Sequence, residues 1–332
     1  MHKKTRHFSE FFRKKACKIT APFSYMQIFL HFFCNLSLRY LHISFFCSTF
    51  AVVMKKMFFY ALALWSLTAC QQVEQQAKVV GRYVPERKDD FAWENEYAAF
   101  RMYGPALAPE NPSNGVDLWL KTSPELVVDS FYYREHVLGL PYHINYGKGL
   151  DCYKVAHTCG AGGLVVIADG QTWIGGPYDR WEILEQTPDK FVFKLEYDSL
   201  LVAGHVLQES ITITAEAGQL QNKAEVVIFG DYEGELLAGG GIYLHDTVDY
   251  HMTIPEVGYV FYEEDALNDK TAARMNYEYN GSTSQGRIQI SVKTPGATLT
   301  DIVDGNLVAV KPYTLGDTLT YFFGATWSEW SN

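Results

Sequence analysis

Alternating apolar and polar residues along much of this chain restrict it to a fold built from β-strands. Residues 181–230 read WEILEQTPDKFVFKLEYDSLLVAGHVLQESITITAEAGQLQNKAEVVIFG and are interrupted at Pro188-Asp189, Ala203-Gly204 and Ala217-Gly218. Successive side chains of a strand point to opposite faces, so period-two runs indicate strands with one buried face, and the interruptions indicate hairpin turns. The segment therefore predicts a series of antiparallel strands.

Shorter runs of the same kind occur in the rest of the chain: VDLWLK, LVVDSFYY, GLVVIAD, GYVFYEE, GRIQISV and TYFFGATW. Aromatic residues, which favour half-buried pleated surfaces, make up 15% of the chain. The best helix candidate is a short one near Glu264–Asp269. We predict an all-β fold, a sandwich of two large antiparallel sheets of the broad, curved kind found in galactose mutarotases and many polysaccharide lyases.

The sequence MKKMFFYALALWSLTACQQ, which begins at Met54, has the organisation of a bacterial signal peptide over residues 54–70. Two lysines and an apolar run precede small residues and Cys70, which predicts cleavage before Cys70 and attachment of lipid to its thiol. The alternative is a secreted protein without lipid. We interpret residues 1–53 as an upstream extension, with translation beginning at Met54. A membrane anchor there is a poor alternative, because Arg39 and polar residues interrupt the apolar stretch.

Charge and length describe the part that would remain after cleavage. Residues 1–70 contain ten of the 28 Lys and Arg residues and one of the 38 Asp and Glu residues, which leaves 18 basic and 37 acidic residues, a net charge of −19. Nucleic-acid binding requires a basic face, so that class of function is disfavoured. We expect a polar tether at residues 71–84, one β-sandwich domain at residues 85–332, and a lipid anchor in the outer membrane of a Gram-negative bacterium, at its periplasmic face or the cell surface.

Three groups of motifs carry a family resemblance. They are ERKDDFAWEN at residues 86–95, YHINYGKGLDCYKVAHTCGAGG at residues 142–163, and TYFFGATW near the C-terminus. From Pro85 to Trp327 the chain resembles domain-of-unknown-function family 4861, secreted proteins of polysaccharide-degrading bacteria. The resemblance implies a part in oligosaccharide breakdown, and one branch of the family is linked to the removal of water from oligosaccharides that carry unsaturated uronic acid. The chain stops at Asn332, where family members tend to continue.

Cys152 and Cys159 stand where the family pattern has apolar or small residues, so their thiols are not the family's shared chemistry. In an oxidising compartment two thiols seven residues apart tend to pair, and we predict a disulfide between them. The alternatives are two unpaired buried thiols, or a zinc site with His157, which lacks both C-x2-C spacing and a fourth ligand. A nucleophilic cysteine is disfavoured for the same reason that favours pairing.

Arginines and tryptophans in an acidic chain favour an anionic sugar as the ligand. We assign substrate binding to Arg87, Trp93, Arg101, Trp173 and Arg180. Guanidinium groups match the geometry of carboxylate or sulfate, and aromatic faces stack on pyranose rings. The alternative is that these arginines form ion pairs with nearby acidic residues and hold loops in place.

Three further residues are candidates for acid–base chemistry: His143, His245 and Lys154. Histidine is the commonest general acid or base, although an isolated histidine is more often structural. Tyr153 and Lys154 are neighbours on an expected strand and point to opposite faces, so we place Lys154 towards the substrate and Tyr153 in the core. The expected chemistry is elimination of water. An arginine would neutralise a uronate carboxylate, one histidine would remove the adjacent proton, and the other histidine or Lys154 would protonate the leaving group.

Other functions are open on the same residues. Paired carboxylates at Asp90 and Glu94 would mark a glycosidase, although arginine-rich surroundings favour an ion-pair network. A sugar-binding lipoprotein of a glycan uptake system would need aromatic residues on an open face but neither His143 nor His245. An epimerase or mutarotase would use the same sandwich and acid–base pair without releasing water. No cofactor is predicted, and participation of a divalent metal is left open.

Overall fold

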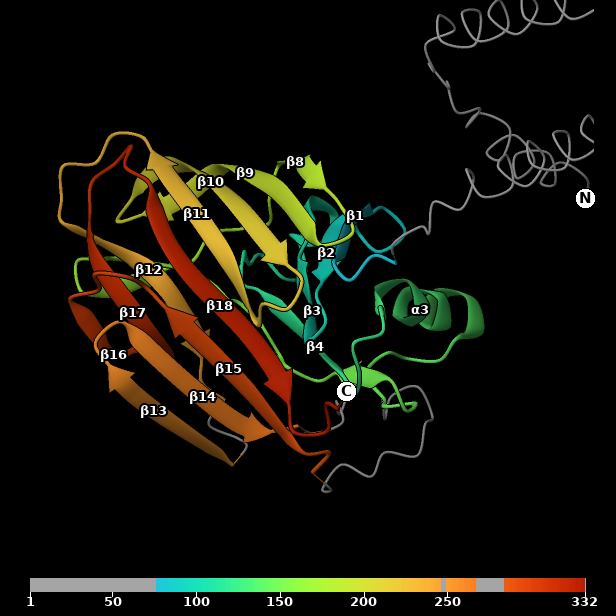
Figure 1. The fold of residues 1–332 in the computed structure, drawn as a ribbon. Helices are drawn as coiled ribbons and strands as arrows, with labels where there is room; N and C mark the ends of the chain where they lie inside the picture. Colours follow the sequence, from blue (N-terminus) through green and yellow to red (C-terminus); the bar gives the residue numbers. More distant parts are fainter. Residues whose placement is uncertain (1–75, 246–248, 267–283, 332) are drawn as a thin grey trace, which may run out of the picture. The chain divides into compact units, whose positions relative to one another are not determined.

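The computed structural model describes residues 76–245, 249–266 and 284–331. The predicted signal peptide, Cys70 and the upstream extension lie outside these residues. The described residues form three antiparallel sheets, one α-helix and two short helical segments, so the predicted all-β fold is confirmed (Figure 1). None of the described helices is long and apolar enough to cross a membrane.

The largest sheet has eight strands in the described part of the chain and contains the predicted hairpins. Its order is β13 (Tyr250–Glu256), β14 (Tyr259–Asp265), β15 (Arg287–Lys293), β18 (Leu319–Trp327), β11 (Gln221–Phe229), β10 (His205–Glu216), β9 (Lys190–Val202) and β8 (Arg180–Gln186). Turns at the three predicted interruptions connect β8 to β11, and positive φ angles at Ala203 and Gly204 close one of them. Alternate residues of β10 and β11 are buried, so one face of these strands joins the core.

Two smaller sheets have five strands each within the described ranges. The N-terminal sheet has the order β1 (Val80–Val84), β2 (Asp90–Glu94), β3 (Ala98–Met102), β4 (Asp117–Lys121) and β5 (Gly149–Asp151). The second small sheet has the order β16 (Leu299–Val303), β17 (Asn306–Tyr313), β12 (Leu236–Tyr243), β6 (Ala161–Ala168) and β7 (Gln171–Trp173). A short 3-10 helix, η1 (Pro105–Leu107), lies between β3 and β4.

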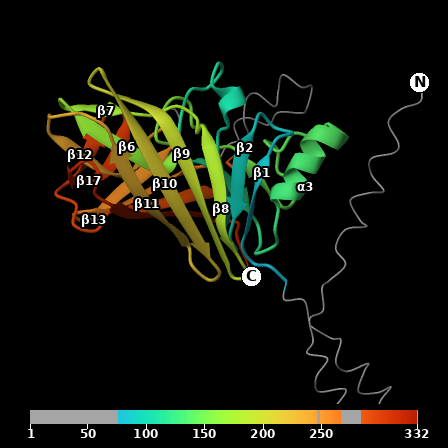
Figure 2. The ribbon, with the colours of Figure 1, turned by 90° about the horizontal axis from the view of Figure 1, so that it is seen from above.

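The eight-stranded sheet packs against both smaller sheets (Figure 2). One continuous apolar core contains residues of all three sheets. Consecutive glycines in β12 permit the second small sheet to approach the eight-stranded sheet closely. A Cβ on Gly240 would lie 2.6 Å from Cγ1 of Val292 and 2.7 Å from the ring of Tyr321. These distances are well below van der Waals contact, so the two sheets pack at this spacing only where β12 lacks side chains.

One predicted strand is a helix instead. The sequence LVVDSFYY forms α3 (Val128–Tyr133), which the π-helical segment η2 (Arg134–Leu138) continues. Val127, Val128, Phe131 and Tyr132 lie on one helical face and pack on Trp119 of β4. This contact covers the face of the N-terminal sheet turned away from the large sheet (Figure 2). The spacing of four between Val127 and Phe131 was the helical signal, and the apparent period of two concealed it.

Two smaller expectations are also corrected. The predicted tether at residues 71–84 ends before β1, because Val79 and Val84 are buried and the whole strand pairs with β2. The helix expected near Glu264–Asp269 begins inside β14, where Glu264 lies opposite Ile288 in the ladder with β15. Residues 267–269 lie outside the described part of the chain.

Candidate functional site

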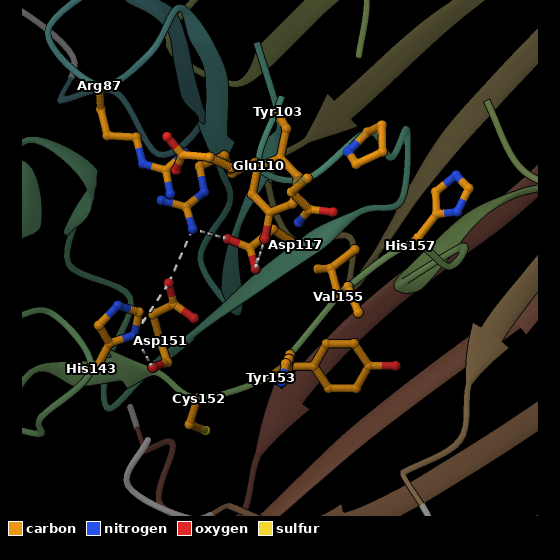
Figure 3. A pocket seen from close by; sticks show the side chains of 15 residues that line it. Arg87, Tyr103, Glu110, Asp117, His143, Asp151, Cys152, Tyr153, Val155 and His157 are labelled. Carbon is orange, nitrogen blue, oxygen red and sulfur yellow. Dashed lines mark hydrogen bonds and ion pairs between the residues drawn. The ribbon is translucent and has the colours of Figure 1, made fainter. Parts of the chain in front are cut away.

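A cavity of about 560 Å³ opens where the N-terminal sheet meets the segment that leads to the second small sheet. Arg101, Asp117 and Asp151 come from β3, β4 and β5, and residues 152–157 form another part of the wall (Figure 3). The remaining lining residues are Arg87, Tyr103, Glu110, Asn111, Pro112 and His143. The volume is within the range of small-ligand sites, and the charged lining favours a polar ligand.

Arg101 is the buried cation of this cavity. Its side chain is 3% exposed, and Nη2 lies 2.6 Å from Oδ2 of Asp117 and 3.1 Å from Oδ2 of Asp151. Nη1 donates a hydrogen bond of 3.2 Å to the hydroxyl of Tyr142, and the guanidinium carbon lies 5.0 Å from the centre of the Trp119 ring. The guanidinium of Arg101 therefore holds the carboxyl groups of Asp117 and Asp151 in place in the wall of the cavity.

Asp151 and His143 form a titratable pair in the cavity. Burial, followed by the charge of Asp117, raises the pKa of Asp151 to about 7, although His143 and Arg101 act in the opposite direction. The backbone carbonyl of Asp151 lies 3.0 Å from Nδ1 of His143. A carbonyl only accepts hydrogen bonds, so Nδ1 carries the proton of the neutral ring and Nε2 is the basic nitrogen. A carboxyl group that titrates near neutral pH beside an imidazole is suited to proton transfer.

Arg87 supplies a more accessible cation. Its Nη1 lies 3.1 Å from Oδ2 of the buried Asp90, and its guanidinium carbon lies 5.7 Å from the centre of the Tyr103 ring. The side chain is 20% exposed, against 3% for Arg101. Of the two arginines in the cavity, Arg87 is therefore better placed to meet an incoming carboxylate.

Tyr153 and Lys154 both line the cavity, and residues 152–155 are not part of the expected strand. Tyr153 is buried, and its hydroxyl donates a hydrogen bond of 2.7 Å to the carbonyl oxygen of Tyr243 on β12. Lys154 is exposed and lines the cavity. Tyr153 is thus buried, but it borders the cavity together with Lys154.

His245 lies outside the set of residues that line the cavity. Its Nδ1 is 2.8 Å from Oε2 of the buried Glu264, and its Nε2 is 2.7 Å from the carbonyl oxygen of Lys154. Both partners are acceptors, so both ring nitrogens act as donors and neither has a lone pair for a substrate proton. Burial alone would lower the pKa of His245, but the hydrogen bond and charge of Glu264 outweigh it and the pKa is raised. His245, predicted to act as the general base or the general acid, is therefore not among the residues that line the cavity, and the doubly protonated ring cannot serve as a base.

Three residues predicted to bind substrate lie away from the cavity. Trp93 is fully buried in the main core. Trp173, on β7, donates its indole N–H to a backbone carbonyl of its own hairpin. Arg180 lies on the edge strand β8, where two neighbouring carboxylates hold its guanidinium. The ion-pair alternative therefore describes all three arginines, Arg87, Arg101 and Arg180. Of the five predicted residues only Arg87 and Arg101 reach the cavity.

The predicted disulfide between Cys152 and Cys159 is not formed. Cys159 is a free and fully buried thiol, and its sulfur lies 3.0 Å from the side-chain oxygen of Asn306. Cys152 packs against the main core, whereas Cys159 belongs to a separate apolar cluster of the second small sheet, so the two side chains diverge. Burial raises the pKa of the Cys159 thiol and keeps it protonated and unreactive.

The zinc alternative is not formed either. In the described ranges, no group of three or more His, Cys, Asp or Glu side chains is placed to hold a metal ion. His157 lines the cavity and is exposed.

Asp90 and Glu94, the alternative glycosidase pair, have structural partners. Both oxygens of Glu94 accept backbone N–H groups at the start of α3, from Val127 and Val128, at 2.8 to 3.0 Å. The same carboxylate lies 2.9 Å from Nζ of the fully buried Lys121. Asp90 pairs with an arginine and accepts a backbone N–H. The pair thus matches the expected ion-pair network rather than two carboxyl groups around a sugar.

Sequence reasoning missed Asp117 and Asp151. Each is the single carboxyl group of a fully buried strand, in the sequences DLWLK and GLD. A charge within a buried strand is costly unless it is paired, and this was the signal that a partner such as Arg101 must exist.

Three known proteins or families resemble this chain. A family model described as "Domain of unknown function (DUF4861)" matches residues 51–332. A protein of Formosa agariphila, described as "Uncharacterized protein P7", is 28% identical over 206 residues, which cover 60% of this chain and 51% of that protein. The chain thus spans about half the length of this relative. Among solved structures, the GH36 alpha-galactosidase AgaB of Geobacillus stearothermophilus is similar with 11% identity and a TM-score of 0.36, over 76% of this chain and 41% of that one.

Proposed function

The chain belongs to the domain-of-unknown-function family DUF4861, and we propose that it is a carbohydrate-processing enzyme, a lyase that removes water from oligosaccharides containing uronic acid. The observation that carries the proposal is the cavity in which Arg87, His143 and Lys154 line one space together with Asp151. The whole chain has a formal net charge of −10. The cavity mixes carboxyl groups with Arg87 and Lys154, and these two side chains can attract a carboxylate ligand on an otherwise acidic chain.

In an unsaturated uronate the carbon that bears the carboxylate is part of a double bond and has no hydrogen. The first part of the proposed reaction therefore breaks a C–H bond on the carbon next to that double bond, which is conjugated with the carboxylate. Arg87 pairs with the carboxylate and stabilises the enolate-like charge that develops on it. Nε2 of His143 takes the proton, because the carbonyl of Asp151 holds the N–H on the other side of the ring. The electron pair of the C–H bond becomes the carbon–carbon double bond.

The second part expels the neighbouring hydroxyl group. The C–O bond breaks as the double bond forms, and Lys154 donates the proton that lets the oxygen leave as water. Asp151 lies between His143 and Arg101, and its raised pKa lets it exchange a proton with His143 between turnovers. Proton balance is complete, because one proton is taken from carbon and one is given to oxygen.

A mass measurement tests the proposal. The full chain is incubated with oligosaccharides that end in an unsaturated uronate, and we expect a product lighter by one water with unchanged chain length. His143→Ala should lower the rate by about 100-fold or more, as loss of a general base does. Arg87→Lys should also weaken the reaction, since a point charge does not reproduce a two-pronged contact.

His205→Ala is the matched control, because His205 is exposed, is not among the cavity-lining residues, and contacts the carbonyl of Asp231 and the ring of Tyr232. It should leave the rate unchanged, and thermal unfolding should show that all three variants are folded. Binding of the oligosaccharides without any change in mass would contradict the lyase proposal and favour a sugar-binding lipoprotein. A product of unchanged mass but altered configuration would favour an epimerase or mutarotase.

A further inference from the structure

Residues 153–157 form a wall of the cavity without the support of a sheet. Among the described residues, these five make no backbone–backbone hydrogen bond, and Ala156 has a φ of 50° that side-chain-bearing residues rarely adopt. A segment of this kind opens at low free-energy cost unless side chains hold it. Several side chains do so. Tyr153 and Val155 are buried in the main core, and the hydroxyl of Tyr153 donates to a carbonyl of β12. The hydroxyl of Thr158 donates to the carbonyl of Val155, and the ring of His245 donates to the carbonyl of Lys154.

The partners of His245 require that its ring donate at both nitrogens. The carbonyl oxygen of Lys154 can only accept, so Nε2 carries a proton. On the other side, the hydroxyl of Tyr262 accepts the backbone N–H of His245 at 3.2 Å and gives its own proton to Oε2 of Glu264 at 2.6 Å. Glu264 is thus an acceptor for the hydroxyl and for Nδ1 of the ring. A ring that donates at both nitrogens is an imidazolium cation.

We propose that His245 is a positioning residue whose imidazolium links the wall of the cavity to β14. The ring donates one hydrogen bond to the carbonyl oxygen of Lys154 and one to Glu264, and we call this pair of hydrogen bonds the clip. When the ring loses a proton, the one remaining N–H stays with the charged Glu264. The lone pair of Nε2 then faces the carbonyl oxygen of Lys154, and the clip opens at that end. The inference rests on these contacts alone and holds whether or not the cavity eliminates water from a sugar.

The surroundings of His245 set the direction of its pH dependence. The titratable groups that face the ring are Glu264 and Tyr262 on β14, Tyr243 on β12, and Tyr153 and Lys154 on the wall segment. Burial disfavours the cation, but the hydrogen bond and charge of Glu264 raise the pKa above the ordinary value of histidine. The clip is therefore complete at acidic pH and is lost as pH rises through this raised pKa.

Limited cleavage by trypsin tests the clip directly, because the bond between Lys154 and Val155 contains the carbonyl that His245 holds. Cleavage requires local opening of the segment, and its rate follows the population of the open form. We expect the rate for the wild-type full chain to rise as the pH increases above the ordinary pKa of histidine, after division by the rate on a small peptide substrate at each pH. His245→Gln should be cut about tenfold faster at pH 7, since it loses a hydrogen bond to a charged group.

Glu264→Gln supplies the second variant. A glutamine can donate to Nδ1 of a neutral ring, which leaves Nε2–H on Lys154, so cleavage should be slow and independent of pH. His205→Gln is the matched control and should be cut like the wild type. Any of three results would overturn the proposal. The first is an equal cleavage rate for His245→Gln and wild type at pH 7, and the second is absence of cleavage at Lys154 in both proteins. The third is a cleavage rate of Glu264→Gln that depends on pH as the wild-type rate does. NMR titration of the wild type measures the pKa of His245 directly. A value at or below the pKa of a histidine in an unstructured peptide would also overturn the proposal.

Discussion

Glu209 is a carboxyl group inside the main core, opposite Tyr197 in the ladder between β9 and β10. Both of its oxygens and the hydroxyl of Tyr197 are buried and have no hydrogen-bond partner within the described part of the chain. Burial raises the pKa of Glu209 to about 8, so the folded protein holds it as the neutral acid at pH 7. The alternating pattern of β10 does not distinguish this position from its apolar neighbours Ile211 and Ile213, and only the three-dimensional contacts show its isolation.

Replacement of Glu209 by Gln should make the stability of the protein less sensitive to pH. An unfolded Glu ionises near pH 4.5, whereas the folded one keeps its proton to about pH 8, so the unfolded state gains an advantage as pH rises through this window. The expected slope is about 1.4 kcal/mol per pH unit at most, and the variant should lose it. Urea unfolding at pH 5, 6, 7 and 8 measures the difference. The exposed Glu235→Gln is the control, and an equal pH slope in wild type and Glu209→Gln would refute the expectation.

At the scale of elements, the strands were predictable because their period of two is local, and β4, β6, β14, β15 and β18 all lie where alternation placed them. Helix α3 was not predictable in the same way, since six residues give too short a window to separate helix from strand. What makes it a helix is tertiary: the N-terminal sheet offers an apolar face around Trp119, and Glu94 of β2 receives its first N–H groups. Neither partner is adjacent to α3 in the sequence.

Glu94→Gln should therefore destabilise the protein strongly. The substitution weakens the N-terminal contacts of α3 and leaves Lys121, fully buried, without its counter-charge. Breaking a buried pair in this way costs about 3 to 5 kcal/mol. Glu125→Gln is the matched control, because Glu125 forms a similar pair with Lys148 at the surface and its loss should change stability little. Chemical unfolding of both variants measures the effect, and equal loss in the two would show that burial of the pair is unimportant.

At the scale of the whole molecule, the cavity arises where the N-terminal sheet meets loops and the segment at residues 152–157, and this is why only part of it followed from the sequence. Arg87, Arg101, His143 and Lys154 were chosen from motif-rich segments and do line it. The other predicted residues of the site were chosen by the same chemistry, but their positions depend on which sheet face each strand presents to the core. A strand pattern predicts alternation, and it does not predict which of two faces packs against a second sheet.

The attachment of the whole molecule to a membrane is a prediction about residues outside the described part of the chain. If Cys70 carries the lipid, a Cys70→Ser variant expressed from Met54 should lose fatty-acid labelling and leave the membrane fraction. Metabolic labelling with a fatty acid and fractionation of cells measure both effects. Cys159→Ser should keep the label, since its thiol is buried in the folded domain. Labelling that persists without Cys70 would exclude the lipoprotein.

The segment at residues 152–157 is both a wall of the cavity and the only covalent passage from β5 of the N-terminal sheet to β6 of the second small sheet. A molecule bound in the cavity touches one sheet through Arg101 and Asp117 and the other through this passage. We expect occupancy to couple the unfolding of the N-terminal sheet to that of this segment, because a ligand that binds only their folded arrangement stabilises both together. The calorimetric transition should sharpen and move upward with ligand concentration, so the width of a melting curve becomes a way to search for the natural sugar without knowing its reaction.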